Sequence, residues 1–433
     1  MGPAKNILLL ASKLGYQTRS FAEAARKLGV GVQFATDRCH QLDDPWADGA
    51  LALHFEKPSE AAALIVQLES QRRIDGVLAL GDRPTVAAAM AARALGLPGN
   101  DPAAVLECRS KLRQREILRS AGLPVPGFAS FLIQEDLAAA LRNVQFPCVV
   151  KPLSLAASQG VIRANSAEEF AGAVWRIRAL LESPEVRATR EPHLDRLLVE
   201  DYIPGKEVAV EGLLDNGRLR VLAIFDKPDA LEGPYFEETL YVTPSRLSAE
   251  VQREIESCAR RTAAALGLTH GPVHAEFRIN AQGPWVIEMA PRPIGGLCAR
   301  ALRFGPEKIS LEELLVRHAL SMPGADAQRE ELAAGVMMIP VPRSGVYEAV
   351  QGTEEARAVP GIEDVVITAR EHDPLLAWPE GSSYLGFIFA RGDSPAAVEA
   401  ALRASHACLR FAISDRLPVE HPATRRMPAP ARD

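Results

Sequence analysis

Apolar and polar positions alternate in blocks along the first hundred residues. Mostly apolar runs at 6–11, 30–35 and 77–80 are typical of strands buried on both faces, and a helical spacing of apolar residues marks 20–28 and 59–70 between them. Such an alternation of strands and helices predicts a parallel, doubly wound sheet. We therefore expect the first part of the chain to be an α/β domain.

The middle of the chain mixes helices with further strands. Residues 100–122 predict one helix, opened by Pro102 in its first turn. Amphipathic spacing predicts two more helices at 249–266 and 311–320. Apolar runs predict strands at 146–151, 197–202 and 221–225.

Short strands predominate toward the C-terminus. Apolar runs at 336–341, 365–368 and 385–390 predict strands, and a helix is expected from Pro395. This pattern indicates a separate α+β unit. The last residues, 417–433, are rich in Pro, Ala and Arg and are expected to form a disordered tail.

One stretch, 274–296, combines two acidic residues with alternating strands. A three-residue loop at 281–283, closed by a glycine in the left-handed conformation, sets Glu276 opposite Glu288 on neighbouring strands. The Cβ atoms of such neighbours lie roughly 5 Å apart, so the carboxylates repel each other unless a cation lies between them. The pair predicts a Mg²⁺ site that also uses nucleotide phosphates, although two solvated glutamates on an exposed hairpin give the same pattern.

Two lysines and an arginine indicate where anions could bind. Lys151 ends an apolar strand, and the small residues of 154–161 that follow let backbone N–H groups approach a phosphate. Lys111 lies on a predicted helix, where a solvated charge is the usual interpretation. Arg292 lies on a Pro- and Gly-rich loop with exposed backbone N–H groups, which suits a carboxylate or a phosphorylated intermediate.

Composition narrows the class of partner. The chain has 433 residues, 47% of them hydrophobic, and a formal net charge of −6. No basic patch suits nucleic acid, and no apolar run reaches membrane-spanning length. The six cysteines lack metal-binding spacing and indicate a reducing compartment. We expect a cytoplasmic protein with small-molecule partners, and neither nucleic acid nor a membrane among them.

Taken in order, these segments resemble the ATP-grasp superfamily. The matching features are Lys111, Lys151 with its small-residue loop, the segment VEDYIPGKE at 199–207, and the paired glutamates before Arg292. The resemblance implies an ATP-grasp fold of mixed α/β and α+β class. Its expected parts are an N-terminal parallel-sheet domain at 1–100, an ATP-grasp domain at 101–326 with a mobile lid subdomain at about 125–200, and a C-terminal α+β domain at 327–416.

The resemblance also implies the contacts of the cofactors. The residues expected to bind ATP are Lys111, Lys151, Ser158, Gln159, Gly160, Glu200, Ile203 and Glu207. Among them, Glu200 and the backbone near Ile203 are expected on adenine, and Glu207 on ribose. Glu276 and Glu288 are expected to hold Mg²⁺, as two ions, with Mn²⁺ as an alternative. The family often has Asn where this chain has Ala290, so one metal position is expected to be weakly held or filled by water.

Within the superfamily, the chain looks like the L-amino-acid ligases over nearly its whole length. The segments that carry this likeness are GPVHAEFR, EMAPRPIGG, DKPDALEGPYFEETLYVTPS, GVMMIPVP and EGSSYLGFIFARGDSP. The likeness implies an ATP-dependent carboxylate–amine ligase that forms a peptide bond through an acyl phosphate, with an L-amino acid as a substrate. A homodimer is expected.

The implied reaction assigns further residues. The expected catalytic residues are Arg292, Gly295, Gly296 and His274, and the expected substrate-binding residues are Lys227, Glu237, Glu238 and Arg292. His274 lies two residues before Glu276 on the same strand face, where it could orient that glutamate or accept a proton. A core histidine fits the same position equally well.

Two alternatives stay open. A formate-dependent purine transformylase has an acidic motif that also runs into a Pro-Arg-Pro tripeptide without the usual Asn. A second alternative, from a different class, is an ATP-binding regulatory protein with a degraded site. The second is disfavoured because the charged set is intact: Lys111, Lys151, Glu276, Glu288 and Arg292.

Overall fold

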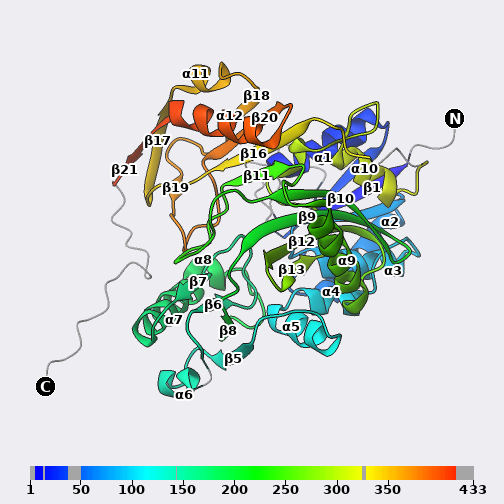
Figure 1. The fold of residues 1–433 in the computed structure, drawn as a ribbon. Helices are drawn as coiled ribbons and strands as arrows, with labels where there is room; N and C mark the ends of the chain where they lie inside the picture. Colours follow the sequence, from blue (N-terminus) through cyan, green and yellow to red (C-terminus); the bar gives the residue numbers. More distant parts are fainter. Residues whose placement is uncertain (1–4, 13–14, 38–49, 143, 324–327, 416–433) are drawn as a thin grey trace, which may run out of the picture.

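The N-terminal part is a four-stranded parallel sheet with helices α1–α3 (Figure 1). The computed structural model describes residues 5–12, 15–37, 50–142, 144–323 and 328–415. The strands, in the order β3-β2-β1-β4, are β1 (Asn6–Ala11), β2 (Gly31–Thr36), β3 (Ala50–Ala52) and β4 (Gly76–Leu80). The helices are α1 (Tyr16–Lys27), α2 (Pro58–Glu69) and α3 (Thr85–Ala94). The predicted parallel sheet is confirmed, and the short β3 is an addition to it.

Residues 100–122 form two helices, so the prediction of one helix was wrong. Helix α4 covers Pro102–Cys108 and helix α5 covers Lys111–Ser120. Between them Ser110 is extended, and its hydroxyl accepts a hydrogen bond from the backbone N–H of Arg113. A serine in this capping position starts a new helix. The break makes Lys111 the first residue of α5.

The centre of the molecule is an eight-stranded antiparallel sheet in the order β13-β12-β9-β10-β11-β16-β20-β18. Its strands are β9 (Lys206–Asp215), β10 (Arg218–Asp226), β11 (Leu240–Thr243), β12 (Gly271–Asn280), β13 (Gly283–Ala290), β16 (Ala333–Ile339), β18 (Ile362–Ile367) and β20 (Gly386–Gly392). Helix α9 (Ala249–Ala265) contacts β10 and β13. Strands β16, β18 and β20 belong to the expected C-terminal unit, so that unit continues the central sheet and does not form a sheet of its own there.

The C-terminal part adds a smaller layer to this shared sheet. A three-stranded antiparallel sheet contains β17 (Gly345–Gln351), β19 (Pro374–Leu375) and β21 (Arg410–Ser414). Its helices are α11 (Thr353–Arg357) and α12 (Pro395–Cys408), and α12 packs on β16 and β20. The tail predicted at 417–433 lies outside the described residues.

A separate small sheet lies at the far side of the central sheet from the N-terminal part (Figure 1). Its strands, in the order β5-β8-β6-β7, are β5 (Phe128–Leu132), β6 (Cys148–Pro152), β7 (Ile162–Ala164) and β8 (Arg196–Asp201). The helices beside it are α6 (Leu137–Leu141), α7 (Ala167–Glu182) and α8 (Pro184–Arg187). The sheet and α7 bury an apolar core of their own. This unit falls within the range predicted for a lid, and we call it the lid.

The hairpin of β12 and β13 pairs Glu276 with Glu288, as predicted, but by a different route. Asn280 pairs with Gly283, so the loop has two residues where three were predicted. This shorter loop moves the pairing by one residue. A bulge at Ile287 restores it, because Phe277 pairs with Val286 and Glu276 with Glu288.

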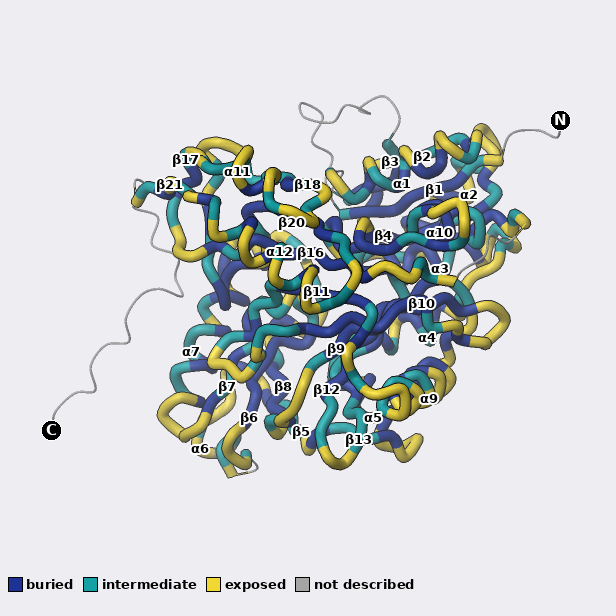
Figure 2. The backbone as a smooth tube through the Cα atoms, turned by 45° about the horizontal axis from the view of Figure 1, so that its top comes forward, coloured by how far each residue is buried: buried dark blue, intermediate teal, exposed yellow. Residues whose placement is uncertain are grey.

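One apolar core joins the N-terminal sheet to the central sheet. It contains Leu9 and Phe34 from the first sheet and Phe225 and Phe387 from the second. Its other members come from helix α10 (Leu311–Ala319), the turn η1 (Cys298–Ala301) and the small hairpin of β14 (Arg303–Phe304) and β15 (Ile309–Ser310). Figure 2 shows β1, β4, β9 and β10 as buried strands of the two sheets. Within the described residues, the model contains no helix of the length and apolar character that crossing a bilayer requires.

Candidate active site

A cavity of about 570 Å³ lies where the lid, the central sheet and the N-terminal part meet. This volume is typical of a small-molecule site. The predicted residues that line the cavity are Lys111, Lys151, Ser158, Glu200, Ile203, Glu207, Glu238, His274, Glu276, Glu288, Arg292, Gly295 and Gly296. Four predicted residues are not in its wall: Gln159, Gly160, Lys227 and Glu237. Most of the predicted residues therefore lie at one cavity, although they make up less than half of its wall.

The two predicted phosphate lysines enter the cavity from different elements. Lys111, at the start of α5, donates from Nζ to the Leu155 carbonyl at 2.7 Å. Lys151, at the end of β6, is buried and lies 2.5 Å from a Glu200 oxygen. Both ammonium groups therefore meet at the small-residue loop that follows β6, as a phosphate site requires.

Only part of that loop faces the cavity. Ser158 lines it, with a left-handed φ of 54°. Gln159 instead donates from its amide to the Glu380 carbonyl at 2.7 Å, and the N–H of Gly160 donates to the Pro379 carbonyl at 2.8 Å. These two contacts join the lid to the C-terminal part, and the ATP contacts of Gln159 and Gly160 stay a prediction.

Glu200 is part of a buried ion-pair triad. Its carboxylate accepts from Arg115 Nε at 2.6 Å and contacts Lys151, and all three side chains are at least nine-tenths buried. Burial alone would raise the pKa of Glu200, but Arg115 and Lys151 together lower it to about 2. Glu200 thus orients Lys151, and this structure gives no support to the adenine contact predicted for it.

Glu207 also forms internal ion pairs. One of its oxygens lies 2.8 Å from Lys227 Nζ, and the other lies 2.8 Å from Arg278 Nε. Arg278 also donates to the Ile203 carbonyl at 2.8 Å, so the guanidinium ties the strand β9 to the segment before it. Ile203 lines the cavity as predicted, whereas the ribose contact predicted for Glu207 competes with two cations that already hold it.

The metal pair fits Mg²⁺ in donor type and placement. Glu276 and Glu288 are cross-strand neighbours and both line the cavity. Glu276 is held 3.2 Å from Lys227 Nζ, whereas the half-exposed Glu288 lies 3.9 Å from Lys111 Nζ. Mg²⁺ needs one or two carboxylates and fills its other positions with water and phosphate oxygens. Ala290 also lines the cavity and offers no ligand where the family often has Asn, so a metal position that is weakly held or filled by water stays a prediction.

His274 connects the metal pair to a buried carboxylate. Its Nδ1 contacts Glu211, which is 1% exposed, and its Nε2 lies 3.6 Å from Glu276. Burial alone would lower the pKa of His274, but Glu211 and Glu276 raise it to about 9. Because both ring nitrogens are engaged and the ring is protonated at neutral pH, His274 orients Glu276 and is a poor proton acceptor.

Arg292 is fixed by the N-terminal part. Its Nε lies 3.0 Å from Asp82, which follows β4, and its pKa is raised because Asp82 offsets the effect of burial. The adjacent loop is held by the Ile294 N–H, which donates to Glu211 at 3.1 Å. Gly296 has a left-handed φ of 64°, and a Cβ there would lie 3.0 Å from the Phe387 ring. Glycine is therefore required at this position for the loop to approach the cavity.

The predicted substrate residues divide into three kinds. Lys227 is buried and bridges Glu207, Glu238 and Glu276, so it is a counter-ion for carboxylates and not a substrate contact in this structure. Glu238 lines the cavity and accepts from the Tyr241 hydroxyl at 2.6 Å. Burial, opposed by Lys227, raises the pKa of Glu238 to about 7. Glu237 is not among the residues that line the cavity.

Sequence reasoning missed several residues of the wall and its support. These are Tyr16, Asp82, Arg115, Glu211, Arg278, Tyr384 and Phe387. Asp82 had a detectable signal, because it directly follows an apolar strand of the parallel sheet, where ligands bind. Glu211 and Arg278 had a weaker sequence signal. Each is a charged residue inside an apolar strand, and a buried charge must be paired with another charge. The aromatic residues carried no local signal.

Comparison with known protein families agrees with this geometry. A model of the ATP-grasp N-terminal domain matches residues 22–99, a model of the ATP-grasp domain matches 144–301, and a model of the L-amino acid ligase C-terminal domain 2 matches 337–414. Together these models span most of the chain. They coincide with the three parts that surround the cavity.

Individual relatives are similar over long stretches. Carnosine synthase 1 of Gallus gallus is 28% identical, covering 96% of this chain and 46% of that protein. Alanine–anticapsin ligase of Bacillus subtilis is 26% identical, covering 56% of this chain and 53% of that protein. The chain thus spans about half the length of these two relatives. The crystal structure of L-amino acid ligase from Bacillus licheniformis superposes with a TM-score of 0.80 at 28% identity, covering 95% of this chain and 99% of that one.

The fold, the two facing glutamates and the matches define the class. The chain belongs to the ATP-grasp superfamily. Within that superfamily it resembles the L-amino-acid ligases, over the C-terminal part as well as the ATP-grasp domain.

Proposed function

We propose that this protein is an ADP-forming ligase that joins a carboxylic acid to an amine, at least one of them an L-amino acid, through an acyl-phosphate intermediate. The observation that carries the proposal is the position of Arg292. Its guanidinium lies in the same cavity as the phosphate lysines and the paired glutamates, but it is held from the N-terminal side by Asp82. The cavity therefore has a second anion site, suited to a carboxylate, beside the proposed γ-phosphate position.

The proposed reaction has two steps. A carboxylate oxygen attacks the γ-phosphorus of ATP, and ADP leaves with the electrons of the broken P–O bond. The amine nitrogen then attacks the acyl carbon, the acyl C–O bond breaks, and phosphate leaves. Lys111 and Lys151 balance charge on the transferred phosphoryl group, and Arg292 holds the acyl phosphate and the oxyanion that follows.

Glu276 and Glu288 are the proposed Mg²⁺ ligands, for two ions, with Mn²⁺ as an alternative. The metal supplies charge neutralisation between the ATP phosphates and the carboxylates. His274 and Lys227 hold Glu276 in place. We assign His274 a positioning role, which differs from the proton acceptor considered from the sequence.

The attacking amine must lose a proton, and Glu238 is the group proposed to bind the ammonium and accept that proton. It lines the cavity, and its pKa of about 7 lies between that of an ordinary carboxylate and that of an amine. Tyr384 and Phe387 supply an apolar wall to the same cavity. An ammonium-binding acid beside an apolar wall suits an amino acid better than a ribonucleotide phosphate.

The test is to incubate the protein with ATP, Mg²⁺ and pooled L-amino acids, measure ADP and phosphate, and identify the amide product by mass. We expect equal amounts of ADP, phosphate and product, and no AMP. Formation of AMP and pyrophosphate would contradict the acyl phosphate. Turnover with formate and glycinamide ribonucleotide, but not with amino acids, would show a transformylase, and ATP binding without turnover under any pairing would show a regulatory protein.

Two variants assign the residues. Arg292→Ala should lower kcat much more than it raises KM, because the acyl phosphate and the oxyanion form only after binding. Glu238→Gln should lower kcat most between about pH 7 and the pKa of the amine, where the wild-type carboxylate is ionised and the amine is still protonated. A change confined to KM in Arg292→Ala would remove that residue from the chemical step.

Light scattering of the purified protein tests the proposed homodimer.

A further inference from the structure

A second group of possible ligands lies away from the ATP cavity, where β9 ends and β12 begins. Asp215 ends β9, His270 precedes β12, and His318 lies in the last turn of α10. One ligand atom from each residue lies within 4.8 Å of the other two. The two imidazole rings stack with their centroids 4.3 Å apart. Three elements distant in the sequence therefore bring two imidazoles and a carboxylate to one point.

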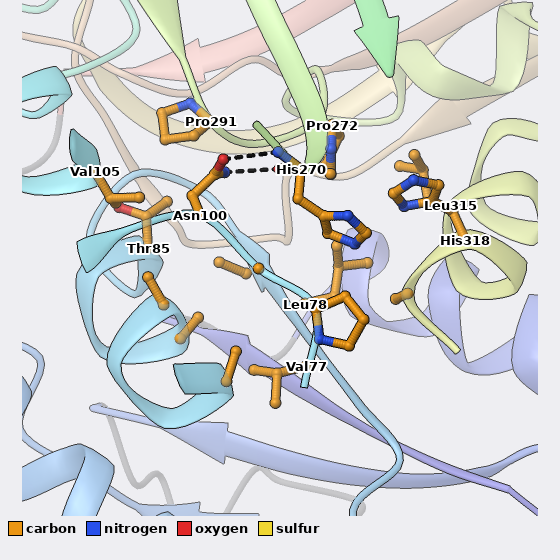
Figure 3. Close-up of a pocket in the computed structure, with 18 residues that line it drawn as sticks. Val77, Leu78, Thr85, Asn100, Val105, His270, Pro272, Pro291, Leu315 and His318 are labelled. Carbon is orange, nitrogen blue, oxygen red and sulfur yellow. Dashed lines mark hydrogen bonds between the residues drawn. The ribbon is translucent and has the colours of Figure 1, made fainter. Parts of the chain in front are cut away.

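The site is built on a fixed backbone. Asn100 accepts from the N–H groups of Thr269 and His270, at 2.7 and 2.9 Å, and donates to the His270 carbonyl at 2.7 Å. Figure 3 shows the bonds between Asn100 and His270, and His270 and His318 line a small cavity of about 60 Å³. The position of His270 is thus set before any ligand binds, as a preformed metal site requires.

The surroundings of the site favour a bound metal ion. The Nε2 atom of His318 is buried and has no hydrogen-bond partner in the described part of the chain. An unpaired buried ring nitrogen is unfavourable, and a metal ion would satisfy it. Asp215 is exposed, which supplies both negative charge and an entry path.

We propose that Asp215, His270 and His318 bind one divalent transition-metal ion of the Zn²⁺ type. Two imidazoles and one carboxylate match the donor preference of Zn²⁺, whereas Mg²⁺ prefers oxygen ligands alone. Ligand atoms around tetrahedral Zn²⁺ lie roughly 3.3 Å apart, given bonds of about 2.0–2.1 Å. The site therefore closes by small side-chain rotations, chiefly of the exposed Asp215, and water completes the coordination.

The site has a structural consequence. It ties α10, which packs on α1 and β4 of the N-terminal part, to β9 and β12 of the central sheet. Arg220 adds a positive charge near His318 and opposes the ion, so Asp215 is needed to offset it. The bound ion acts as a cross-link between the two sheets, independent of ATP and of the proposed ligase reaction.

The test uses the full chain after dialysis against a chelator, with Mg²⁺ in excess to occupy the glutamate pair. Zn²⁺ is titrated by calorimetry, and Co²⁺ is used as a visible probe of the ligands. We expect one Zn²⁺ per chain, a Co²⁺ spectrum without a thiolate band, and a higher unfolding temperature with Zn²⁺. His318→Gln and His270→Gln should each weaken binding at least tenfold, and Asp215→Asn should weaken it less.

His406→Gln is the matched control, because His406 is a half-buried histidine on α12, in the C-terminal part. It should bind Zn²⁺ as the wild type does. Equal affinity and stoichiometry in the wild type and His318→Gln would overturn the proposal, as would a thiolate band with Co²⁺ or the absence of Zn²⁺ binding. Circular dichroism checks the fold of each variant. If one variant does not fold, the Co²⁺ spectrum of the wild type still reports which types of side chain bind the metal ion.

Discussion

At the scale of single residues, Glu200 holds two cations in the interior. Arg115 and Lys151 both contact its carboxylate, and the three side chains are almost fully buried. Removing the negative charge leaves two buried cations unpaired, so Glu200→Gln should lower the free energy of unfolding by about 3–5 kcal/mol. Glu116→Gln breaks an exposed ion pair with Arg113 on the same helix as Arg115 and should cost less than about 1 kcal/mol. Denaturant titration compares the two variants.

The same triad has a predictable pH dependence. The pKa of Glu200 is about 2 in the folded protein, against an ordinary value of 4.5. A lowered carboxylate pKa contributes stability above the unfolded value and loses it as the pH falls through the folded value. The wild type should therefore lose stability between about pH 4.5 and 2, and Glu200→Gln should lack this part of the acid transition. An identical acid transition in both proteins would contradict the ion-pair assignment.

Glu237 should change the stability of the fold with pH in the opposite direction to Glu200. Its Oε1 is buried without a hydrogen-bond partner among the described residues, and burial raises its pKa to about 7. The folded protein holds the proton more tightly than the unfolded chain does, so this contribution to stability is lost as the pH rises from about 4.5 to 7. Glu237→Gln should be more stable than the wild type at pH 8 and similar to it near pH 4. The exposed Glu232→Gln should show no such difference in thermal unfolding.

Some of these residues were predictable and some were not. The alternation of apolar and polar residues in their strands predicted that Glu276 and Glu288 lie opposite each other. The predicted loop was one residue too long, but the bulge at Ile287 restores this pairing. The partners of Arg292 and His274 were not predictable. Asp82 lies 210 residues from Arg292, and Glu211 lies 63 residues from His274, so only the tertiary fold brings each pair together.

At the scale of elements, the lid is fastened on two sides. The segment after α8 places Glu191 between Arg83 and Arg109, with an Arg83 contact at 2.6 Å. On the other side, Arg176 of α7 pairs with Glu380 of the C-terminal part. These pairs are mostly shielded from solvent, so screening by water is limited. These ion pairs therefore join the lid to both neighbouring parts of the molecule.

Weakening one of these ion pairs should uncouple phosphate release from amide formation. Glu191→Gln removes the charge shared by Arg83 and Arg109, so water reaches the acyl phosphate more often. We expect the ratio of phosphate released to amide formed to rise severalfold above one. Glu185→Gln, on the exposed face of α8, should keep a ratio of one. An unchanged ratio in Glu191→Gln would show that this ion pair does not control water access.

Element prediction succeeded where the signal was local. Apolar runs gave the strands of the parallel sheet to within about one residue, because strands buried on both faces need no partner to be recognised. The break at Ser110 was missed, since a capping serine resembles any polar helix residue in sequence. The joining of β16 to β11 was missed because it pairs segments about a hundred residues apart, and apolar alternation does not specify the neighbouring strand.

At the scale of the whole molecule, the cavity wall is complete only when all three parts and the lid are present. The N-terminal part supplies Asp82, the lid supplies Lys151, the central sheet supplies Glu276, and the C-terminal part supplies Tyr384. The apolar core shared by the two large sheets keeps the first, third and fourth of these in fixed relation. Binding of ATP with Mg²⁺ should therefore stabilise the chain as one unit, by about 2.7 kcal/mol at a hundredfold excess over the dissociation constant.

The two metal ligands should differ in what they do without the metal. Glu276 is paired with the buried Lys227, so Glu276→Gln should lower the unfolding temperature of the free protein, by a loss of roughly 1–3 kcal/mol. Glu288 is half-exposed and 3.9 Å from its nearest cation, so Glu288→Gln should leave the free protein nearly unchanged. Both variants should lose the extra stabilisation that Mg²⁺ adds to ATP, because each removes one ligand of the same site. Thermal unfolding with ATP alone and with ATP plus Mg²⁺ measures this difference, and a Mg²⁺-dependent gain that survives in both variants would place the metal elsewhere.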